Sequence, residues 1–216
     1  MTERLDRSSH RRDHWQSVYT DKADSELSWF QERPEQSLAL IRTITPRPVR
    51  ILDVGGGQSA LVGALLDEGP DDPPSSIAVL DLSPAAIERA KARLGPRSDR
   101  VRWIVGDVLE VEHLPQVDLW HDRAVFHFLV AEEDQRRYAE RAAAAVVPGG
   151  HLIVATFGPE GPEKCSGLPV ARHDAASLEA AFAPRFRLVD SAREVHTTPW
   201  GKPQEFTYAV LRRIGS

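Results

Sequence analysis

A glycine-rich turn between an apolar strand and a helix constrains this chain more than any other feature. The stretch Val49–Val54 is expected to be a strand, three glycines follow it, and apolar residues at helical spacing begin at Leu61. A strand that turns abruptly into a helix needs glycines, because they tolerate unusual φ and ψ and let a ligand touch the backbone. Gly55, Gly57 and Ala60 also satisfy the dinucleotide fingerprint G-x-G-x-x-G/A. A dinucleotide, another adenosine ligand and a tight turn without a ligand therefore all remain open at this point.

Downstream of this turn, short apolar runs alternate with helical segments. Ser83 and Pro84 follow the second run in the order that caps a helix. The segment Ala131–Val147 predicts an alanine-rich helix that is stopped by Pro148–Gly150. The runs expected to be strands are Ile77–Leu80, Val101–Val105, Val117–Trp120 and His151–Phe157. Alternation of this kind builds parallel βαβ units with right-handed crossovers.

The carboxyl-terminal part of the chain breaks the alternation. Asp174 is positioned to cap a short helix through Phe182, and the apolar runs Phe186–Arg193 and Glu205–Arg212 then follow each other without a helix between them. Two such strands are expected to form an antiparallel pair at the end of the sheet. The sequence therefore predicts an α/β fold, with a single doubly wound Rossmann-like domain over residues 46–216.

Residues 1–45 are expected to form an N-terminal helical lid segment. Residues 37–44 have apolar side chains at helical spacing, and an aromatic-rich stretch lies before them. The first dozen residues are expected to be mobile, with His10–Arg12 as a solvated charge run.

Composition excludes several classes of protein. The formal net charge of -5 gives no general affinity for phosphate backbones, so a nucleic-acid partner is not expected. Cys165 is the only cysteine, which rules out an intramolecular disulfide and fits a reducing cytosol. The polar start resembles no secretory signal, and no run approaches the ~18 apolar residues of a membrane span. The histidines are scattered without metal-ligand spacing, so we expect a cytoplasmic protein with no metal site and no membrane partner.

Acidic side chains stand where three successive strands are expected to end. Asp53, beside the glycine turn, would repel a pyrophosphate but attract the ammonium and cationic sulfur of S-adenosylmethionine. Asp81 can accept hydrogen bonds from both hydroxyls of a ribose, which suits NAD equally well. Asp107 can accept from an adenine amino group. Together they favour S-adenosylmethionine as the ligand.

These residues carry a resemblance to the class I S-adenosylmethionine-dependent methyltransferases, small bacterial members related to the thiopurine and protein-lysine enzymes. The motifs are Asp53-x-Gly-x-Gly, Asp81, Gly106-Asp107 and Pro148-Gly149-Gly150, and the resemblance spans roughly residues 15–212. It implies a mostly parallel sheet of seven strands in the order 3-2-1-4-5-7-6, with strand 7 antiparallel. One departure is Ser59, where many members carry a third glycine.

The resemblance also implies a set of cofactor-binding residues. Trp15, Tyr19 and Trp29 look like the aromatic lid of small bacterial members, with simple packing of a terminal helix as the alternative. The residues expected to contact S-adenosylmethionine itself are Asp53, Gly55, Gly57, Ser59, Asp81, Leu82, Gly106, Asp107, Val108 and His121.

The methyl acceptor is expected beside the end of the fourth strand, where Asp122, Arg123 and His127 stand. Arg123 and His127 are four residues apart, so a helical turn would put them on one face, with His127 as general base and Arg123 holding a carboxylate. A salt-bridged arginine and a packed histidine are the alternative. Two loops are candidates for the wall of the acceptor pocket, Gly158–Pro169 and Thr197–Trp200.

Methyl transfer to a small-molecule acceptor is the predicted function, because the chain has no added recognition domain. Protein-lysine methylation is the alternative, suggested by the Gly-x-Gly-x-Ser turn. An NAD-dependent oxidoreductase is less favoured, since Asp53 and Asp107 speak against it. A protein that binds the cofactor without catalysis also remains open.

Overall fold

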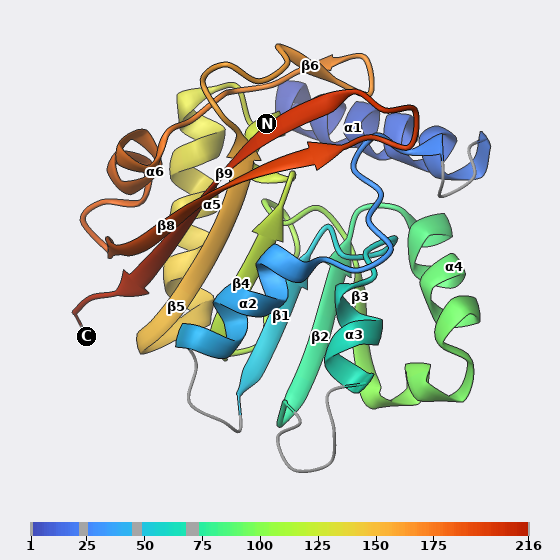
Figure 1. The fold of residues 1–216 in the computed structure, drawn as a ribbon, viewed down its shortest axis with the longest axis horizontal. Helices are drawn as coiled ribbons and strands as arrows, with labels where there is room; N and C mark the ends of the chain where they lie inside the picture. Colours follow the sequence, from blue (N-terminus) through green and yellow to red (C-terminus); the bar gives the residue numbers. More distant parts are fainter. Residues whose placement is uncertain (1, 22–25, 45–48, 68–73, 216) are drawn as a thin grey trace.

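The computed structural model describes residues 2–21, 26–44, 49–67 and 74–215, and its centre is one seven-stranded sheet (Figure 1). The expected boundary between residues 45 and 46 lies outside the described residues. The strands are β1 (Arg50–Val54), β2 (Ser76–Asp81), β3 (Val101–Val105), β4 (Val117–Arg123), β5 (Val146–Phe157), β8 (Phe186–Thr197) and β9 (Pro203–Arg213). Their order is β3-β2-β1-β4-β5-β9-β8, and β9 runs antiparallel to both of its neighbours. This is the predicted order, because β6 (Lys164–Cys165) and β7 (Leu168–Pro169) form a separate hairpin.

Helices cover both faces of the sheet, as the doubly wound fold requires. Successive residues of a strand point to opposite faces, so Ile51 packs with one core and Leu52 with the other. The first core includes α2 (Glu35–Ile44), α3 (Leu61–Asp67) and α4 (Pro84–Leu94). The second includes α5 (Glu132–Ala145) and α6 (Ala175–Phe182). Strands buried on both faces explain the continuous apolar runs of the sequence.

Two helix starts form as the sequence predicts. Ser83 caps α4, because its hydroxyl accepts a hydrogen bond from the backbone N–H of Ala86, and Pro84 occupies the first turn. Asp174 caps α6 in a capping box with Ser177.

The expected stop after α5 is wrong in its position. The helix ends at Ala145, and Pro148–Gly150 lies inside β5 rather than before it. The pairing of β4 with β5 shifts register between Val117 and Leu119, which accommodates the irregular segment. A Cβ on Gly150 would lie 2.8 Å from the carbonyl oxygen of Asp118, so glycine is required by a close approach to β4 and not by a helix cap.

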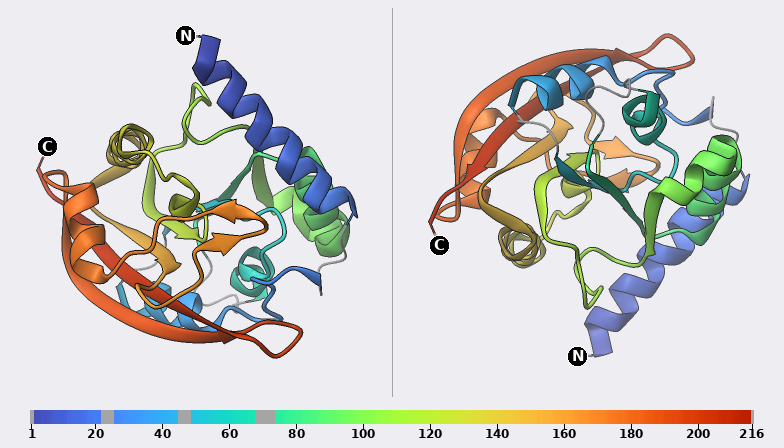
Figure 2. Two further views of the ribbon diagram at one scale, coloured as in Figure 1. Left: turned by 90° about the horizontal axis from the view of Figure 1, so that it is seen from above. Right: turned by 90° about the horizontal axis from the view of Figure 1, so that it is seen from below.

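The N-terminal segment is helical almost from its start. Residues Thr2–Asp21 form α1, which runs beside α4 across the carboxyl ends of the parallel strands (Figures 1 and 2). The Gln16 side-chain oxygen accepts from the Ser83 hydroxyl at 2.8 Å and from the backbone N–H of Ala85 at 3.3 Å. Although α1 has twenty residues, no helix within the described ranges is long and apolar enough to cross a membrane.

Candidate active site

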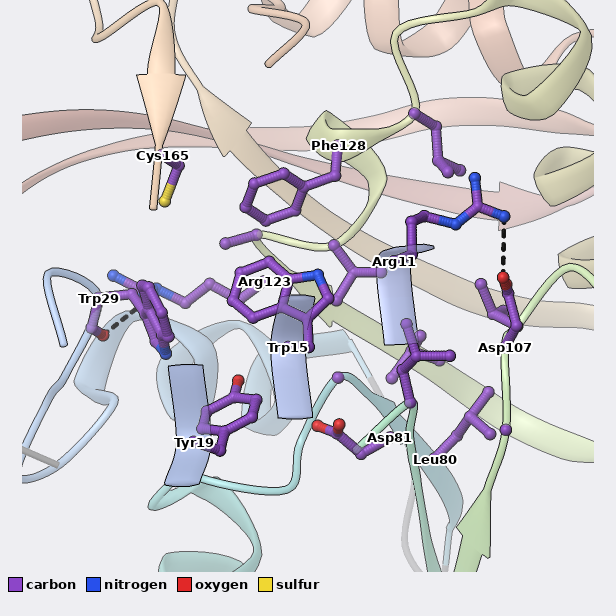
Figure 3. A pocket seen from close by; sticks show the side chains of 18 residues that line it. Arg11, Trp15, Tyr19, Trp29, Leu80, Asp81, Asp107, Arg123, Phe128 and Cys165 are labelled. Atoms are coloured by element: carbon purple, nitrogen blue, oxygen red, sulfur yellow. Dashed lines mark hydrogen bonds and ion pairs between the residues drawn. The ribbon is translucent and has the colours of Figure 1, made fainter. Parts of the chain in front are cut away.

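A cavity of about 110 Å³, partly open to solvent, lies at the carboxyl ends of the parallel strands, with α1 along one side (Figure 3). Arg11 and Asp107 stand at one end of it, Arg123 and Cys165 stand at the other, and aromatic rings lie between them. The lining residues include Trp15, Tyr19, Trp29, Gly55, Asp81, Leu82, Gly106, Asp107, Val108, Arg123, Phe128 and Cys165. In open α/β sheets this edge is where ligands bind.

A smaller cavity of about 50 Å³ adjoins the first, and the two share Trp29, Val54, Gly55 and Arg123 in their linings. The lining of the smaller cavity also includes Ser37, Asp53, Gln58, Ser59 and His121. One ligand could therefore extend from the larger cavity past the glycine turn into the smaller one.

The glycine turn brings backbone close to two carboxylates. Gly55 has a φ of +70°, and a Cβ there would lie 2.2 Å from a methyl group of Val125. A Cβ on Gly56 would lie 2.2 Å from Asp53, and one on Gly57 would lie 2.8 Å from Asp81. Side chains at these positions would collide with the acidic groups, so the turn and the carboxylates form one unit.

Asp53 carries an acceptor without a partner. Its Oδ1 lies 2.7 Å from Nδ1 of His121, whose Nε2 lies 2.9 Å from the hydroxyl of Ser37. Its Oδ2 has no hydrogen-bond partner, and it is buried, since only 2% of the side chain is exposed. A buried carboxylate oxygen needs a donor, and a ligand ammonium would satisfy it. Ser37 was not anticipated, since a serine on an amphipathic helix gives no sequence signal of its partner.

Asp81 is held by the backbone on both of its oxygens. Oδ1 accepts from the N–H of Ser83 at 2.8 Å, and Oδ2 accepts from the N–H of Gly57 at 3.1 Å. Burial raises the pKa of Asp81 to about 6. A carboxylate offers about four lone-pair sites, so two remain for hydroxyl donors in the cavity.

Asp107 is paired, and the predicted solvated charge run is wrong at Arg11. Oδ1 of Asp107 accepts from the N–H of Leu109 at 2.9 Å, and Oδ2 accepts from the guanidinium of Arg11 at 2.8 Å (Figure 3). The other terminal nitrogen of Arg11 lies 3.5 Å from a carboxylate oxygen of Asp134, in the first turn of α5. Arg11 therefore joins α1 to two acidic side chains instead of facing water.

The three lid aromatics lie together over the larger cavity. The ring centre of Trp15 lies 5.6 Å from that of Trp29 and 4.9 Å from that of Phe128, and both pairs are edge-to-face. The ring centres of Tyr19 and Trp29 are 6.3 Å apart. Such edge-to-face pairs stabilise an aromatic wall beyond simple burial. Phe128 was not predicted, since nothing in the sequence told which of the residues after β4 turns inward.

Arg123, the last residue of β4, lines both cavities. Its Nε donates to the Tyr208 hydroxyl at 3.0 Å, and one terminal nitrogen donates to the carbonyl of Trp29 at 3.1 Å. The other terminal nitrogen lies 3.7 Å from Glu194 and makes no hydrogen bond, although only 10% of the side chain is exposed. The guanidinium also stacks 4.3 Å from the ring centre of Phe206. Arg123 therefore keeps one terminal nitrogen without a hydrogen bond, buried beside Glu194.

His127 and Asp122 do not join Arg123 in either lining. The expected helical turn is wrong, since Arg123 is in β4 and His127 is in the short 3₁₀ helix η3 (Phe126–Phe128). His127 is fully buried against Phe128 and Phe157, and burial lowers its pKa to about 3.

Asp122 instead stabilises the turn that follows β4. Its oxygens accept from the N–H groups of Val125 and Phe126 at 2.9 and 3.0 Å, and from the hydroxyl of Tyr138. Burial raises its pKa to about 6.

The remaining candidates divide between the cavities and the frame around them. Leu82, Gly106 and Val108 line the larger cavity. Ser59 lines the smaller one, and its hydroxyl also accepts from the N–H of Leu61 at 3.0 Å. Gly57 is in neither lining, and its backbone N–H donates a hydrogen bond that holds Asp81.

Of the two candidate loops, the first reaches the larger cavity through Cys165, whereas Thr197–Trp200 lines neither cavity and Trp200 is 54% exposed. Within the described part of the chain, no group of three His, Cys, Asp or Glu side chains is placed to hold a metal ion.

Comparison with known proteins identifies the central part of the chain. Residues 52–152 match the family model for a methyltransferase domain. A malonyl-[acyl-carrier protein] O-methyltransferase of Anoxybacillus flavithermus is 27% identical over 143 residues, which are 66% of this chain and 52% of that protein. A second such enzyme, from Ilyobacter polytropus, is 33% identical over 108 residues, which are 50% of this chain and 38% of that protein. The chain thus spans about half the length, or less, of these curated relatives.

Solved structures share the fold over nearly the whole chain. A structure described as converting a disulfide bond into a thioacetal group during echinomycin biosynthesis has a TM-score of 0.75 at 18% identity, covering 94% of this chain and 93% of that one. A didemethyltoxoflavin N1-methyltransferase of Burkholderia thailandensis, with S-adenosylhomocysteine bound, has a TM-score of 0.65 at 20% identity, covering 99% and 87%. On the family match over residues 52–152 and this shared fold, the chain is similar to the class I S-adenosylmethionine-dependent methyltransferases.

Proposed function

We propose that this protein transfers the methyl group of S-adenosylmethionine to a small-molecule acceptor held in the aromatic part of the larger cavity. The observation that carries the proposal is the placement of Asp53, Asp81 and Asp107 at the ends of β1, β2 and β3, around two joined cavities. We further propose that residues 46–216 form the cofactor-binding domain and residues 1–45 its lid.

The residues around the cavities fit this cofactor part by part. Asp107, with Gly106 and Val108, would hold the adenine, and Asp81 would accept from the ribose hydroxyls. The buried free oxygen of Asp53 would accept from the methionine ammonium, while the glycine turn lets the ligand pass close to the backbone. A pyrophosphate beside that free carboxylate oxygen would be repelled, which favours S-adenosylmethionine over NAD.

The acceptor is proposed to lie between the lid aromatics and the end of β4. The wall there combines Trp15, Trp29 and Phe128 with Arg123 and Cys165. Aromatic walls bind flat apolar ligands well, and the spare N–H groups of Arg123 favour an acceptor that carries a carboxylate or carbonyl oxygen. For such an acceptor, Arg123→Ala should raise KM.

When bound, the cofactor supplies a methyl group that its sulfonium already activates for displacement. The part played by the protein is to hold the nucleophile in line with that group and to keep water away. His127 is buried outside both linings, so we propose that transfer proceeds without it as a base. His127→Ala should then lower turnover only a few fold, whereas a loss of at least ~100-fold would restore it as a catalytic base.

A small acceptor is favoured over a protein lysine. The Burkholderia neighbour holds its small-molecule acceptor, 1,6-didemethyltoxoflavin, and the Anoxybacillus and Ilyobacter relatives are O-methyltransferases. The small, partly open cavity beside the lid also suits a compact acceptor better than a folded protein surface.

Titration calorimetry with S-adenosylmethionine, S-adenosylhomocysteine and NAD tests the proposal. The first two ligands are expected to bind with dissociation constants in the micromolar range, and NAD is expected not to bind. Binding of NAD alone would overturn the proposed function. A search for the acceptor then follows with labelled cofactor and panels of small carboxylates and carbonyl compounds.

A further inference from the structure

Arg11 is a charged residue of the larger cavity to which the proposed function assigns no role. It comes from α1, whereas the side chain it binds, Asp107, follows β3 almost a hundred residues later. Their contact measures 2.8 Å, and the two side chains are 23% and 5% exposed. An ion pair this shielded is screened less by salt than a surface pair.

The same guanidinium controls the surroundings of Asp107. Asp134 contributes a second carboxylate 3.5 Å from Arg11, so loss of the cation would leave two acidic groups facing one another. One oxygen of Asp107 is fixed by the N–H of Leu109, and Arg11 fixes the other. The plane of the carboxylate is therefore set jointly by its own loop and by α1.

We propose that Arg11 is a specificity-determining residue for the adenine of the cofactor, a role that rests on the proposed function. By fixing the orientation of the Asp107 carboxylate, Arg11 makes it an acceptor for a ligand amino group rather than for a ligand carbonyl. Because Arg11 belongs to α1, the same contact brings Trp15 and Tyr19 over the cavity. The ion pair thus links base selection to lid docking, to which the hydrogen bonds of Gln16 also contribute.

The experiment compares S-adenosylhomocysteine with S-inosylhomocysteine, in which a carbonyl oxygen replaces the adenine amino group. Calorimetry is carried out on the full chain and on Arg11→Gln, which keeps much of the side-chain length but removes the charge. The wild type should prefer the adenosyl ligand by about tenfold or more, since a site built for a donor rejects a ligand that lacks it. Arg11→Gln should weaken S-adenosylhomocysteine binding by about tenfold and reduce the preference by roughly fivefold.

Two further variants separate this role from a structural one. Arg12 is the exposed neighbour of Arg11 in α1, so Arg12→Gln should bind both ligands as the wild type does. Arg11→Lys keeps the cation and should restore most of the preference. Melting temperatures of all variants show whether they are folded.

The possible failures are distinguishable. If the wild type does not bind S-adenosylhomocysteine, the proposed function fails. If it does bind and Arg11→Gln binds within twofold of it, the role of Arg11 is overturned. An equal loss for both ligands would also overturn the role in base selection, because it would leave Arg11 with lid docking alone.

Discussion

Asp81 shows how one side chain joins the turn of β1 to the end of β2. Its two oxygens accept hydrogen bonds from the backbone N–H groups of Gly57 and Ser83, and the side chain lines the larger cavity. A bound ribose would therefore find the acceptors already oriented. Asp81→Ala should cost roughly 2–4 kcal/mol of cofactor affinity, from charged hydrogen bonds of ~1.5–3 kcal/mol each less partial replacement by water. Calorimetry with S-adenosylhomocysteine measures the loss.

Asp81→Asn should lose less than Asp81→Ala, because one acceptor oxygen survives. The deoxy ligand lacking both ribose hydroxyls serves as the control, since its affinity should differ little between wild type and variants. An unchanged dissociation constant of S-adenosylhomocysteine in Asp81→Ala would contradict the assignment.

At the opposite end of the ligand, Asp53 is expected to act on the amino-acid part alone. Its free Oδ2 faces no donor of the protein, so the methionine ammonium would add a charged hydrogen bond there. Asp53→Ala should weaken S-adenosylhomocysteine binding by ~1.5–3 kcal/mol while leaving the affinity for adenosine unchanged. An equal loss of affinity for S-adenosylhomocysteine and for adenosine would contradict this role. It would mean that the variant disturbs the whole glycine turn, through the lost contact with His121.

At the scale of elements, η3 decides which side chains after β4 reach the cavity. Phe128 points to Trp15, whereas His127 is packed against Phe157 with both ring nitrogens lacking a hydrogen-bond partner. Its pKa falls from 6.5 to about 3 on folding, mainly through burial. Between these values the unfolded chain binds more protons, so the contribution of His127 to stability is lost as the pH falls below 6.5.

The size of this effect can be measured with His127→Leu. At pH 5 His127 is protonated in the unfolded chain but not in the native state, which lowers the free energy of unfolding by about 2 kcal/mol relative to pH 7. Asp81 and Asp122, with raised pKa values near 6, act in the opposite sense, but they are present in both proteins and cancel. Denaturant unfolding should therefore show a smaller drop from pH 7 to pH 5 in His127→Leu, by about 2 kcal/mol.

The matched control is His113→Leu, which makes the same substitution at a histidine whose side chain is 89% exposed. If His127→Leu and the wild type lost the same free energy between the two pH values, the histidine would not be buried as neutral imidazole.

The elements that sequence patterns predict best are those fixed by local chemistry. Strands flanked by glycine or by Ser83-Pro84 formed where expected, because caps and turns act within a few residues. The strand β5 was misjudged because Gly150 serves a contact with β4 that no local pattern reveals. Arg11 was misjudged for the same reason, since its partner Asp107 is remote in sequence.

At the scale of the whole molecule, the ligand pocket is shared among distant parts of the chain. Loops after β1, β2, β3 and β4 contribute to the larger cavity, and so do α1 through Trp15 and β6 through Cys165. Both α1 and β6 lie beyond the carboxyl ends of the parallel strands (Figure 1). Strand-helix alternation predicted the parallel βαβ units, and the order of the strands was predicted from the resemblance to the class I methyltransferases. Which side chains of α1 and η3 face inward could not be predicted, because that depends on packing between elements far apart in sequence.

This shared pocket implies that a bound ligand stabilises the native state as a unit. Unfolding dismantles every part of the site together, so S-adenosylhomocysteine at one hundred times its dissociation constant should add about 2.7 kcal/mol to the free energy of unfolding. For a chain of 216 residues this corresponds to a rise in Tm of about 5–10 °C. Scanning calorimetry should show one transition that moves up with ligand concentration, while NAD leaves it in place and Asp81→Ala shifts the response to higher concentration. A transition that split on addition of ligand, with only one part moving, would mean that α1 or the β8–β9 pair unfolds independently of the site.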